Sequence, residues 1–432
     1  MMEPVLQVAL DFADLERALR LAREAVGGGA DWIEIGTPLI KSEGLDAIRR
    51  FRAEFPRQTL VADMKTMDAG RAEMEMAAKA GANVAIVLGV ADDGTIRESI
   101  EAGRSQGLRV GVDLIRTADP ARRAEQAREW GADHVVVHCG IDEQMRGGTP
   151  FDMLRMIAGR VDLPLAAAGG LNSETVADAV EAGARILIVG GAITKSPDAR
   201  AATRQIADAM RSRARVATDL FKRSSPERLR ETLLKVSTAN LSDGAHRRPC
   251  MEGIRPVMTG LKMVGAAVTV RTFPGDWSKP VQAIDQAGPG DVIVVDAGSR
   301  GPAVWGELAT HSALQRKVAG IVIDGGIRDT AEIRALGFPA FARLILSNAG
   351  EPKGFGEINI PVTVGGLRVE PGDWIVGDDD GVMVLPKARA VEMANYGMDR
   401  LEAENRIRQE IEGGRTTLGQ VTDLLRWDKK TG

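Results

Sequence analysis

The feature that most constrains the fold is a repeat in the first half of the chain. Short runs rich in Val, Ile, Leu and Ala alternate there with amphipathic segments of helical period. Eight such runs occur, at residues 6–11, 32–36, 59–65, 83–89, 109–115, 134–139, 164–170 and 186–191. They lack an alternation of apolar and polar residues, which is typical of strands buried on both faces of a parallel sheet. The repeat therefore predicts a (β/α)8 TIM barrel over residues 1–212.

Charged residues and glycines gather at the C-terminal ends of these runs, where the active sites of TIM barrels lie. The set consists of Asp11, Glu34, Asp63, Lys65, Asp68, Asp113, His138, Gly169, Gly170, Gly190 and Gly191. A solvated strand end with an incidental ion pair is the alternative for any one of them. Because charged groups from five runs converge on one mouth, an active site is the better interpretation of the whole set.

Each residue type in this set suits a chemical task. Glu34 and Asp63 offer hard oxygen ligands for Mg²⁺ (or Mn²⁺), with water and substrate oxygens completing the shell. Lys65 lies between carboxylates, which keep it charged, so that it can stabilise an enediolate oxygen. His138 suits proton transfer near neutral pH, and the glycine pairs let backbone N–H groups approach a phosphate. Together these residues predict the enolisation of a sugar phosphate on a metal.

Several motifs of this half also resemble a known family. LQVALD, IEIGTPLIKSEG, VADMKTMDAG, VLGVADDGTI, HCGIDEQ, AAGGLNSETV and VGGAITKSPD lie within residues 5–210. This stretch resembles the 3-hexulose-6-phosphate synthases of the orotidine-monophosphate-decarboxylase suprafamily. The resemblance implies an aldehyde-lyase that condenses D-ribulose 5-phosphate with formaldehyde to D-arabino-3-hexulose 6-phosphate, or runs the reverse reaction.

The resemblance also implies a role for individual residues. Glu34 and Asp63 resemble the metal ligands of the family, while Asp11 and Lys65 resemble its substrate and enediolate contacts. His138 resembles the acid/base, and Asp68 an aspartate that is lent across a dimer interface into the neighbouring site. The alternative is a 3-keto-L-gulonate-6-phosphate decarboxylase, which has an arginine three residues after the equivalent of His138. Ile141 occupies that position here and favours the synthase.

The second half of the chain follows a different pattern. Strand-like runs at 266–273, 291–298, 318–325 and 374–386 alternate with turns and with fewer helical segments. We expect a helical linker over residues 213–234 and a separate α/β domain over 235–432, which ends in a charged helix.

One stretch of this second half carries a candidate site. The glycine-rich DAGSRG leads into AVWGELATHSAL, so the amides around Gly306, Glu307 and Leu308 predict an anion site at the start of a helix. Arg328 and Asp329 follow another strand-like run; an arginine binds carboxylates and an aspartate holds Mg²⁺. The set suits a 2-keto acid that is enolised or decarboxylated, whereas Arg328–Asp329 alone would more often be a surface ion pair.

The second half also resembles a family, through STANLSDG, AVWGELAT, IDGGIRDTAE, LGFPAFAR and residues 361–386. Residues 235–410 resemble the RraA-like family, which includes 4-hydroxy-4-methyl-2-oxoglutarate aldolases and regulators of ribonuclease activity that lack the metal site. Arg328 and Asp329 favour the catalytic branch. The chain is therefore expected to be a bifunctional lyase, and a non-catalytic regulatory or oligomerisation module is the alternative for its second half.

Composition excludes several classes of function. The 56 basic and 60 acidic residues give a net charge of −4, which does not support a nucleic-acid or membrane surface. No signal peptide pattern begins the sequence, and Cys139 and Cys250 provide no disulfide framework, so we expect a cytoplasmic protein. The two resemblances imply a homo-oligomer, with dimer contacts through the barrel and trimer contacts through the second domain. A hexamer is the smallest closed assembly that uses both.

Overall fold

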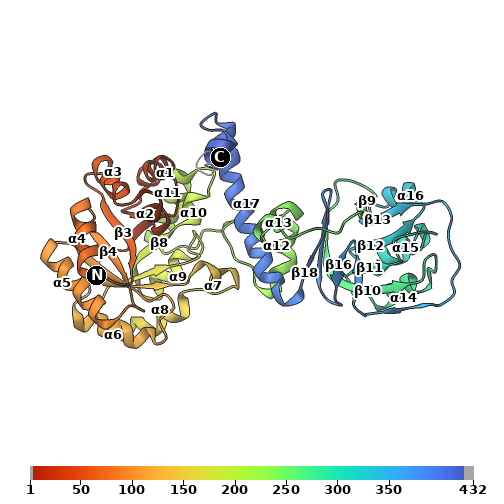
Figure 1. Ribbon diagram of the computed structural model, residues 1–432, viewed down its shortest axis with the longest axis horizontal. Coiled ribbons are helices and arrows are strands. Elements are labelled where there is room, and N and C mark those ends of the chain that lie inside the picture. Colours follow the sequence, from red (N-terminus) through yellow and green to blue (C-terminus); the bar gives the residue numbers. More distant parts are fainter. Residues whose placement is uncertain (1–2, 423–432) are drawn as a thin grey trace, which may run out of the picture. The chain divides into compact units, whose positions relative to one another are not determined.

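The computed structural model describes residues 3–422 and divides into two compact units (Figure 1). The first unit contains the described residues up to 144, residues 148–223 and the residues from 402 onward. The second unit contains residues 145–147 and 224–401. The chain therefore leaves the first unit after residue 223 and returns to it at residue 402.

The first unit is built on a closed barrel of eight parallel strands in chain order. β1 pairs with β8, and Val8 lies opposite Val189 in this closing pair. The strands are β1 (Val5–Leu10), β2 (Trp32–Ile35), β3 (Thr59–Thr66), β4 (Val84–Leu88), β5 (Arg109–Asp113), β6 (His134–His138), β7 (Leu165–Ala168) and β8 (Ala184–Val189). The predicted TIM barrel is confirmed.

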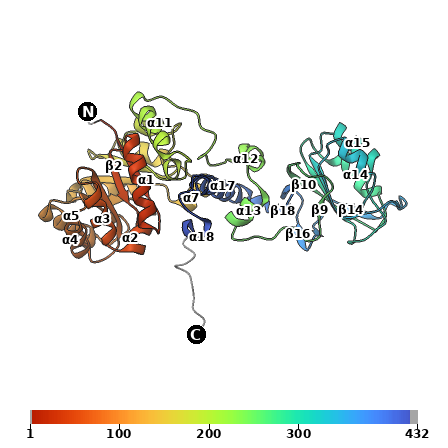
Figure 2. The ribbon, with the colours of Figure 1, turned by 90° about the horizontal axis from the view of Figure 1, so that it is seen from above.

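Helices surround this barrel (Figures 1 and 2). They are α1 (Leu15–Gly28), α2 (Thr37–Glu43), α3 (Asp46–Glu54), α4 (Gly70–Ala80), α5 (Asp93–Gln106), α6 (Pro120–Trp130), α7 (Ile141–Met145), α8 (Phe151–Ala158), α9 (Val176–Glu181), α10 (Gly191–Thr194) and α11 (Ala199–Ser212). Aspartate side chains cap the N-termini of four of them, at Asp14, Asp92, Asp119 and Asp198. Glycines in the left-handed conformation end α1, α4, α5 and α6, so local sequence signals set these boundaries.

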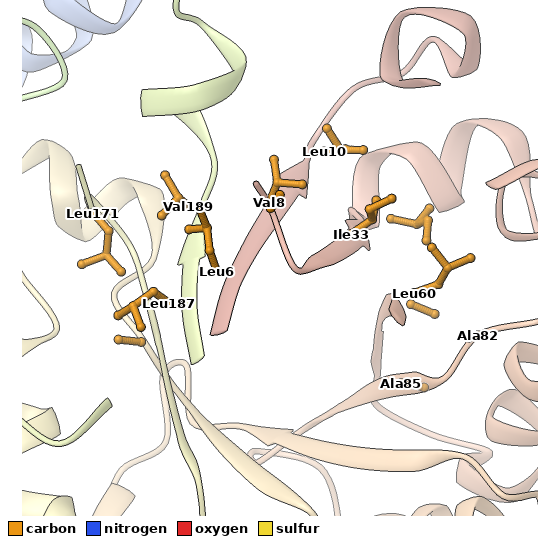
Figure 3. Close-up of a cluster of buried hydrophobic side chains, with 14 of the residues drawn as sticks. Leu6, Val8, Leu10, Ile33, Leu60, Ala82, Ala85, Leu171, Leu187 and Val189 are labelled. Carbon is orange, nitrogen blue, oxygen red and sulfur yellow. The ribbon is translucent and has the colours of Figure 1, made fainter. Parts of the chain in front are cut away.

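Two layers of apolar side chains hold the barrel together. Outward-pointing residues such as Leu6, Val8 and Leu187 are fully buried between strands and helices (Figure 3). Inward-pointing residues form a separate cluster of Val61, Val84, Ile86, Val136, Ala166, Ala168 and Ile186. Because successive strand residues point to opposite faces, each strand serves both layers, and its sequence reads as a continuous apolar run.

The connector that follows the barrel differs from the expected helical linker. Residues 214–225 have no helix or strand, and helical structure begins only with η1 (Pro226–Arg228) and α12 (Leu229–Lys235). Barrel side chains bind the backbone of this segment: Ser173 donates to the carbonyl of Val216, and Asn172 donates to the carbonyl of Phe221. These tertiary hydrogen bonds replace the ones that a helix would make.

The second unit contains a mixed sheet in the order β18-β17-β10-β11-β12-β13-β9, with β14 paired to β10. Its strands are β9 (Arg255–Pro256), β10 (Met263–Thr272), β11 (Val292–Asp296), β12 (Gly320–Ile327), β13 (Ala340–Ile345), β14 (Gly356–Ile358), β17 (Trp374–Asp378) and β18 (Gly381–Leu385). A separate hairpin consists of β15 (Val362–Val364) and β16 (Leu367–Val369). The predicted α/β domain is confirmed, but the run expected at 374–386 is two antiparallel strands, because the chain turns at Asp379–Asp380.

Apolar layers cover both faces of this sheet. On one face α14 (Ser278–Gln286), α15 (Glu307–Gln315) and α16 (Thr330–Ala335) bury Ile284, Ala313 and Ile333 (Figure 1). On the other face the β15–β16 hairpin packs Val362, Val364 and Val369 against the sheet. The remaining helices of the unit are α13 (Thr238–Gly244), η2 (Lys387–Arg389) and the first part of α17 (Ala390–Glu412), and α18 (Leu418–Val421) follows in the first unit. Within residues 3–422 no helix is both long and apolar enough to cross a membrane.

His134 generates a prediction about stability. Its side chain is only 4% exposed, and a Cβ at Gly111 on the adjacent strand would lie 2.4 Å from its Nε2 atom. Burial and then the charge of Arg109 lower the pKa of His134 to about 4. As the pH falls, His134 of the unfolded chain is protonated near pH 6.5, whereas His134 of the folded chain stays neutral until about pH 4. The contribution of neutral His134 to the free energy of unfolding is therefore fully present above about pH 6.5 and is lost as the pH falls towards 4.

We expect urea denaturation at a series of pH values to show that His134 lowers the free energy of unfolding by up to about 3 kcal/mol between pH 7 and pH 4. Replacement by leucine, His134→Leu, removes the titrating group and should flatten the pH dependence by that amount. Carboxylates contribute equally to both proteins, so the difference between the two curves isolates His134. Identical pH dependence in the two proteins would contradict the assignment.

Candidate active site

Several of the predicted residues point into the barrel because of their position along the strands. Asp63 follows Val61 by two residues, and His138 follows Val136 by two residues, and both valines belong to the inward cluster. Alternation therefore turns the carboxylate and the imidazole into the mouth of the barrel. The structure brings Asp63 and His138 to one place, as the sequence predicted.

Lys65 lies at the centre of this mouth. The regular pairing of β3 with β4 shifts between Ala62 and Thr66, and Lys65 takes a left-handed backbone conformation with φ 46°. Its Nζ atom lies 2.9 Å from Oδ2 of Asp63 and 3.3 Å from Oδ2 of Asp113. Burial alone would lower the pKa of Lys65, but the charges of Asp63 and Asp113 outweigh it and raise the pKa. The lysine is therefore held as a cation.

Asp113 joins Lys65 to His138. Its Oδ2 atom lies 2.9 Å from Nδ1 of His138, and its Oδ1 atom accepts a hydrogen bond from the amide of Ile115. Burial favours the neutral acid, yet the hydrogen bond from His138 and the charges of His138 and Lys65 hold the pKa of Asp113 below its usual value. The contact at Nδ1 leaves Nε2 as the nitrogen that can meet a substrate. The sequence placed Asp113 at the mouth but did not give it this role.

Carboxylates crowd the other side of the mouth. Glu34 is buried and accepts a hydrogen bond from Gln7. Burial and then the charges of Asp63 and Asp11 raise the pKa of Glu34 well above its usual value. Burial and then the charge of Asp63 also raise the pKa of Asp11. The ionised forms of these carboxyl groups are therefore disfavoured in the mouth as it stands, and a bound cation would favour them.

This donor set fits a divalent cation. Within the described residues no group of three or more His, Cys, Asp or Glu side chains forms a metal site by itself. Glu34 and Asp63 would therefore supply two oxygen ligands, and water and substrate oxygens would supply the others, as is usual for Mg²⁺. The hydroxyl of Thr37 lies 2.8 Å from Oδ2 of Asp63 and fixes the orientation of that carboxylate. Thr37 and Gln7 were not predicted, because neither residue type marks a site in the sequence.

Glycine at the strand ends has two different causes. Gly169 has φ 108°, and a Cβ there would lie 2.3 Å from the carbonyl oxygen of Cys139, so the fold itself requires this glycine. Gly191 begins α10, and a Cβ there would come no closer than 3.7 Å to Lys195. Protein packing does not demand glycine at position 191. Close approach of a ligand to the backbone is a physical reason that remains.

Asp68 stands apart from the other residues. Its side chain is exposed, and Oδ1 accepts a hydrogen bond from the following amide of Ala69 at 2.7 Å. The structure does not bring it into the network of Lys65 and Asp113. A role in a neighbouring molecule stays a prediction.

The second unit contains a pocket of about 260 Å³ at the N-terminus of α15. Its walls include all five residues that the sequence predicted, Gly306, Glu307, Leu308, Arg328 and Asp329. Trp277 and Trp305 also line it and were not predicted, because a tryptophan in a sequence does not distinguish a pocket wall from a core position.

Asp329 organises this pocket. It has φ 55°, and its Oδ2 atom accepts a hydrogen bond from the amide of Glu307 at 3.1 Å. A Cβ at Gly306 would lie 2.4 Å from the same oxygen, so a larger residue there would displace the Asp329 carboxylate. The Nε atom of Arg328 lies 3.5 Å from Oδ2 of Asp329. Because the Glu307 amide already has a carboxylate partner, a ligand anion would depend mainly on Arg328.

Comparison with known proteins places the barrel in a family. Residues 4–206 match the profile of the orotidine 5'-phosphate decarboxylase / HUMPS family. The 3-hexulose-6-phosphate synthase of Methylomonas aminofaciens is 42% identical over 201 residues, which are 46% of this chain and 96% of the relative. The chain belongs to the orotidine 5'-phosphate decarboxylase / HUMPS family.

Other proteins are also similar to this HUMPS-family chain. The 3-hexulose-6-phosphate synthase of Mycobacterium gastri is 41% identical over 201 residues, 46% of this chain and 97% of the relative. A crystal structure of 3-hexulose-6-phosphate synthase from Salmonella typhimurium is 36% identical, with a TM-score of 0.47, over 48% of this chain and 99% of that one. Residues 238–384 match the RraA-like profile, described as Aldolase/RraA. Both resemblances seen in the sequence are confirmed.

Proposed function

We propose that the barrel is an aldehyde-lyase that condenses D-ribulose 5-phosphate with formaldehyde to D-arabino-3-hexulose 6-phosphate, or runs the reverse reaction. Relatives named 3-hexulose-6-phosphate synthase match over 96–97% of their own length and support this activity. The single structural observation that carries the proposal is the Asp63–Lys65–Asp113–His138 network at the barrel mouth. A cytoplasmic location stays a prediction.

The network can perform this chemistry step by step. The glycines after β7 and β8 would bind the phosphate through backbone amides. Nε2 of His138 would take a proton from C1 of the pentulose phosphate, and Asp113 would stabilise the imidazolium that results. The Lys65 ammonium would stabilise the negative oxygen of the enediolate. C1 would then form a bond to the formaldehyde carbon, while the formaldehyde oxygen takes up a proton.

A divalent metal, Mg²⁺ or Mn²⁺, would be held by Glu34 and Asp63 and would polarise the oxygens of the bound sugar. A 3-keto-L-gulonate-6-phosphate decarboxylase is the alternative for the barrel. The residue that differs, Ile141, begins α7 and is 52% exposed. An apolar side chain at this position offers no cation to a substrate carboxylate, which favours the synthase.

Asp113 gives the sharpest test of the barrel. Its replacement by asparagine preserves the shape but removes the charge that joins Lys65 to His138. We expect Asp113→Asn to lower kcat by about 10²-fold, as for the loss of a general acid–base system, with a smaller change in KM. The measurement is formaldehyde consumption with ribulose 5-phosphate and Mg²⁺.

Asp31→Asn is the matched control, since Asp31 accepts a backbone hydrogen bond from Leu6 at the opposite end of the barrel. It should keep the wild-type kcat. A kcat for Asp113→Asn within about twofold of wild type would refute the network as the catalytic centre.

We also propose that the barrel forms dimers in which Asp68 reaches the site of the partner molecule. The support is the resemblance, together with the exposed position of Asp68 outside its own network. Chains carrying Lys65→Ala and chains carrying Asp68→Ala should each be inactive. A mixture in equal amounts should regain about a quarter of the wild-type activity, because half of the random dimers contain one complete site. A mixture that stays inactive, or a monomer in light scattering, would contradict this arrangement. Trimer contacts through the second unit stay a prediction.

For the second unit we propose Mg²⁺-dependent cleavage or decarboxylation of a 2-keto acid. The pocket that joins Arg328 to Asp329 supports this proposal. Arg328 would bind the carboxylate of the substrate, and Asp329 would hold the metal directly or through water. A regulatory or oligomerisation module without chemistry is the second candidate, because Asp329 also accepts a hydrogen bond from the first amide of α15 and so has a structural task.

Asp329→Asn distinguishes the two. Asparagine tolerates the left-handed backbone of position 329, so the unit should fold. We expect decarboxylation of oxaloacetate to fall by at least about 10²-fold, since the metal loses its charged ligand. Formaldehyde consumption by the barrel of the same protein is the internal control and should not change. Equal oxaloacetate activity in both proteins would contradict the role of Asp329 as metal ligand, whereas no activity in either would favour the non-catalytic module.

A further inference from the structure

The last part of α17 carries charged residues in an unusual place. Glu402, Arg406 and Glu410 are 0%, 2% and 3% exposed. A spacing of four residues places them on one face of the helix, and all three belong to the barrel unit. Buried charges are costly unless they are paired, so this face must have specific partners in the barrel. This end of α17 contacts α1, because Arg406 donates hydrogen bonds to Glu24.

Arg406 binds the loop that follows β8. Its Nη1 atom donates to the carbonyl oxygens of Ser196 at 3.2 Å and Pro197 at 3.1 Å. The same guanidinium pairs with Glu24 of α1 at 3.0 Å and with Glu410 at 2.7 Å. One side chain thus ties the β8 loop to α1 and to α17. A planar arginine with several fixed donors suits such a junction better than a lysine does.

The bound loop also carries part of the candidate phosphate site. It starts with Gly190 and Gly191, continues through α10 and ends with Lys195, Ser196 and Pro197. The Lys195 amide donates to the carbonyl of Gly191, so the two ends of this short loop are linked. Displacement of the carbonyls that Arg406 holds would therefore move both the glycine pair and Lys195.

Glu402 reaches the β7 loop by a second route. It accepts hydrogen bonds from the Phe221 amide at 2.6 Å and from Arg223 at 3.2 Å. The Phe221 carbonyl in turn accepts a hydrogen bond from Asn172 at 2.8 Å. Asn172 lies two residues after Gly170, and its Oδ1 atom accepts a hydrogen bond from the Glu174 amide in the same turn. The same face of α17 therefore supports both glycine loops.

We infer that Arg406 is a positioning residue for the sugar-phosphate site of the barrel. The inference rests on the proposed function of that barrel. The part of the chain that matches the family profile ends at residue 206, and Arg406 is supplied by the segment that returns after the second unit. The barrel site of this chain is then complete only when the return segment is bound. Glu402 assists through the connector.

The test uses the full chain and the variant Arg406→Lys. Lysine keeps the positive charge between Glu24 and Glu410 but cannot also hold two carbonyls. We expect KM for ribulose 5-phosphate to rise about fivefold to tenfold with kcat within about twofold, because the phosphate loops move while the Lys65–His138 network stays. The dissociation constant of ribulose 5-phosphate, measured by calorimetry, should rise by the same factor.

Arg408→Lys is the matched control. Arg408 lies on the same helix, is exposed and pairs with Asn405, so KM should stay at the wild-type value. Glu24→Gln is a second variant for the case that Arg406→Lys does not fold. It loosens the guanidinium from α1 without altering α17, and it should raise KM in the same direction by a smaller factor.

The outcomes separate two failures. If the wild-type chain consumes formaldehyde and the folded variants keep the wild-type KM and dissociation constant, Arg406 has only a structural task and the inference is wrong, even if the melting temperature falls. If the wild-type chain neither consumes formaldehyde nor binds ribulose 5-phosphate, the proposed function is wrong and the inference falls with it.

Discussion

The charge balance around Lys65 is the constraint on which the barrel site depends. One ammonium group lies within 3.3 Å of two buried carboxylates, Asp63 and Asp113, and Asp113 in turn holds His138. Each of these groups would be costly inside the barrel without its partner. The left-handed backbone conformation of Lys65 is strained for a residue other than glycine, and it brings the ammonium to this position. The charged forms of the remaining carboxyl groups, Glu34 and Asp11, are disfavoured by burial and by Asp63, and a divalent metal would stabilise them.

The second constraint is the return of the chain to the barrel. Residues 224–401 form most of another compact unit, and α17 then supplies buried charges to the barrel unit. A domain that merely follows another in sequence would leave the first one complete. Here Arg406 binds carbonyls of the β8 loop, so the first unit is completed by residues that follow the second. This arrangement links the integrity of the barrel to the whole chain.

Much of the fold could be predicted from local pattern. Continuous apolar runs that alternate with helical segments identified the barrel, because burial on both faces of a strand leaves a direct mark in the sequence. Their position at the ends of apolar runs also predicted that Asp63 and His138 lie at the barrel mouth. The predictions were less accurate for the linker and for residues 374–386. Hydrogen bonds from Asn172 and Ser173 bind the backbone of the non-helical connector, and a turn at Asp379–Asp380 divides the run into two strands.

The sequence by itself determined the barrel, the second α/β unit and the residue types at both candidate sites, since periodicity and motif spacing depend on neighbours along the chain. Only the tertiary structure decided that Asp113 joins Lys65 to His138. It also decided that Asp329 accepts a hydrogen bond from the Glu307 amide and that Arg406 binds the β8 loop. Each of these contacts connects residues that are far apart in the sequence. Charge pairing and hydrogen-bond geometry act through space, so no local pattern records which partner a buried charge will meet.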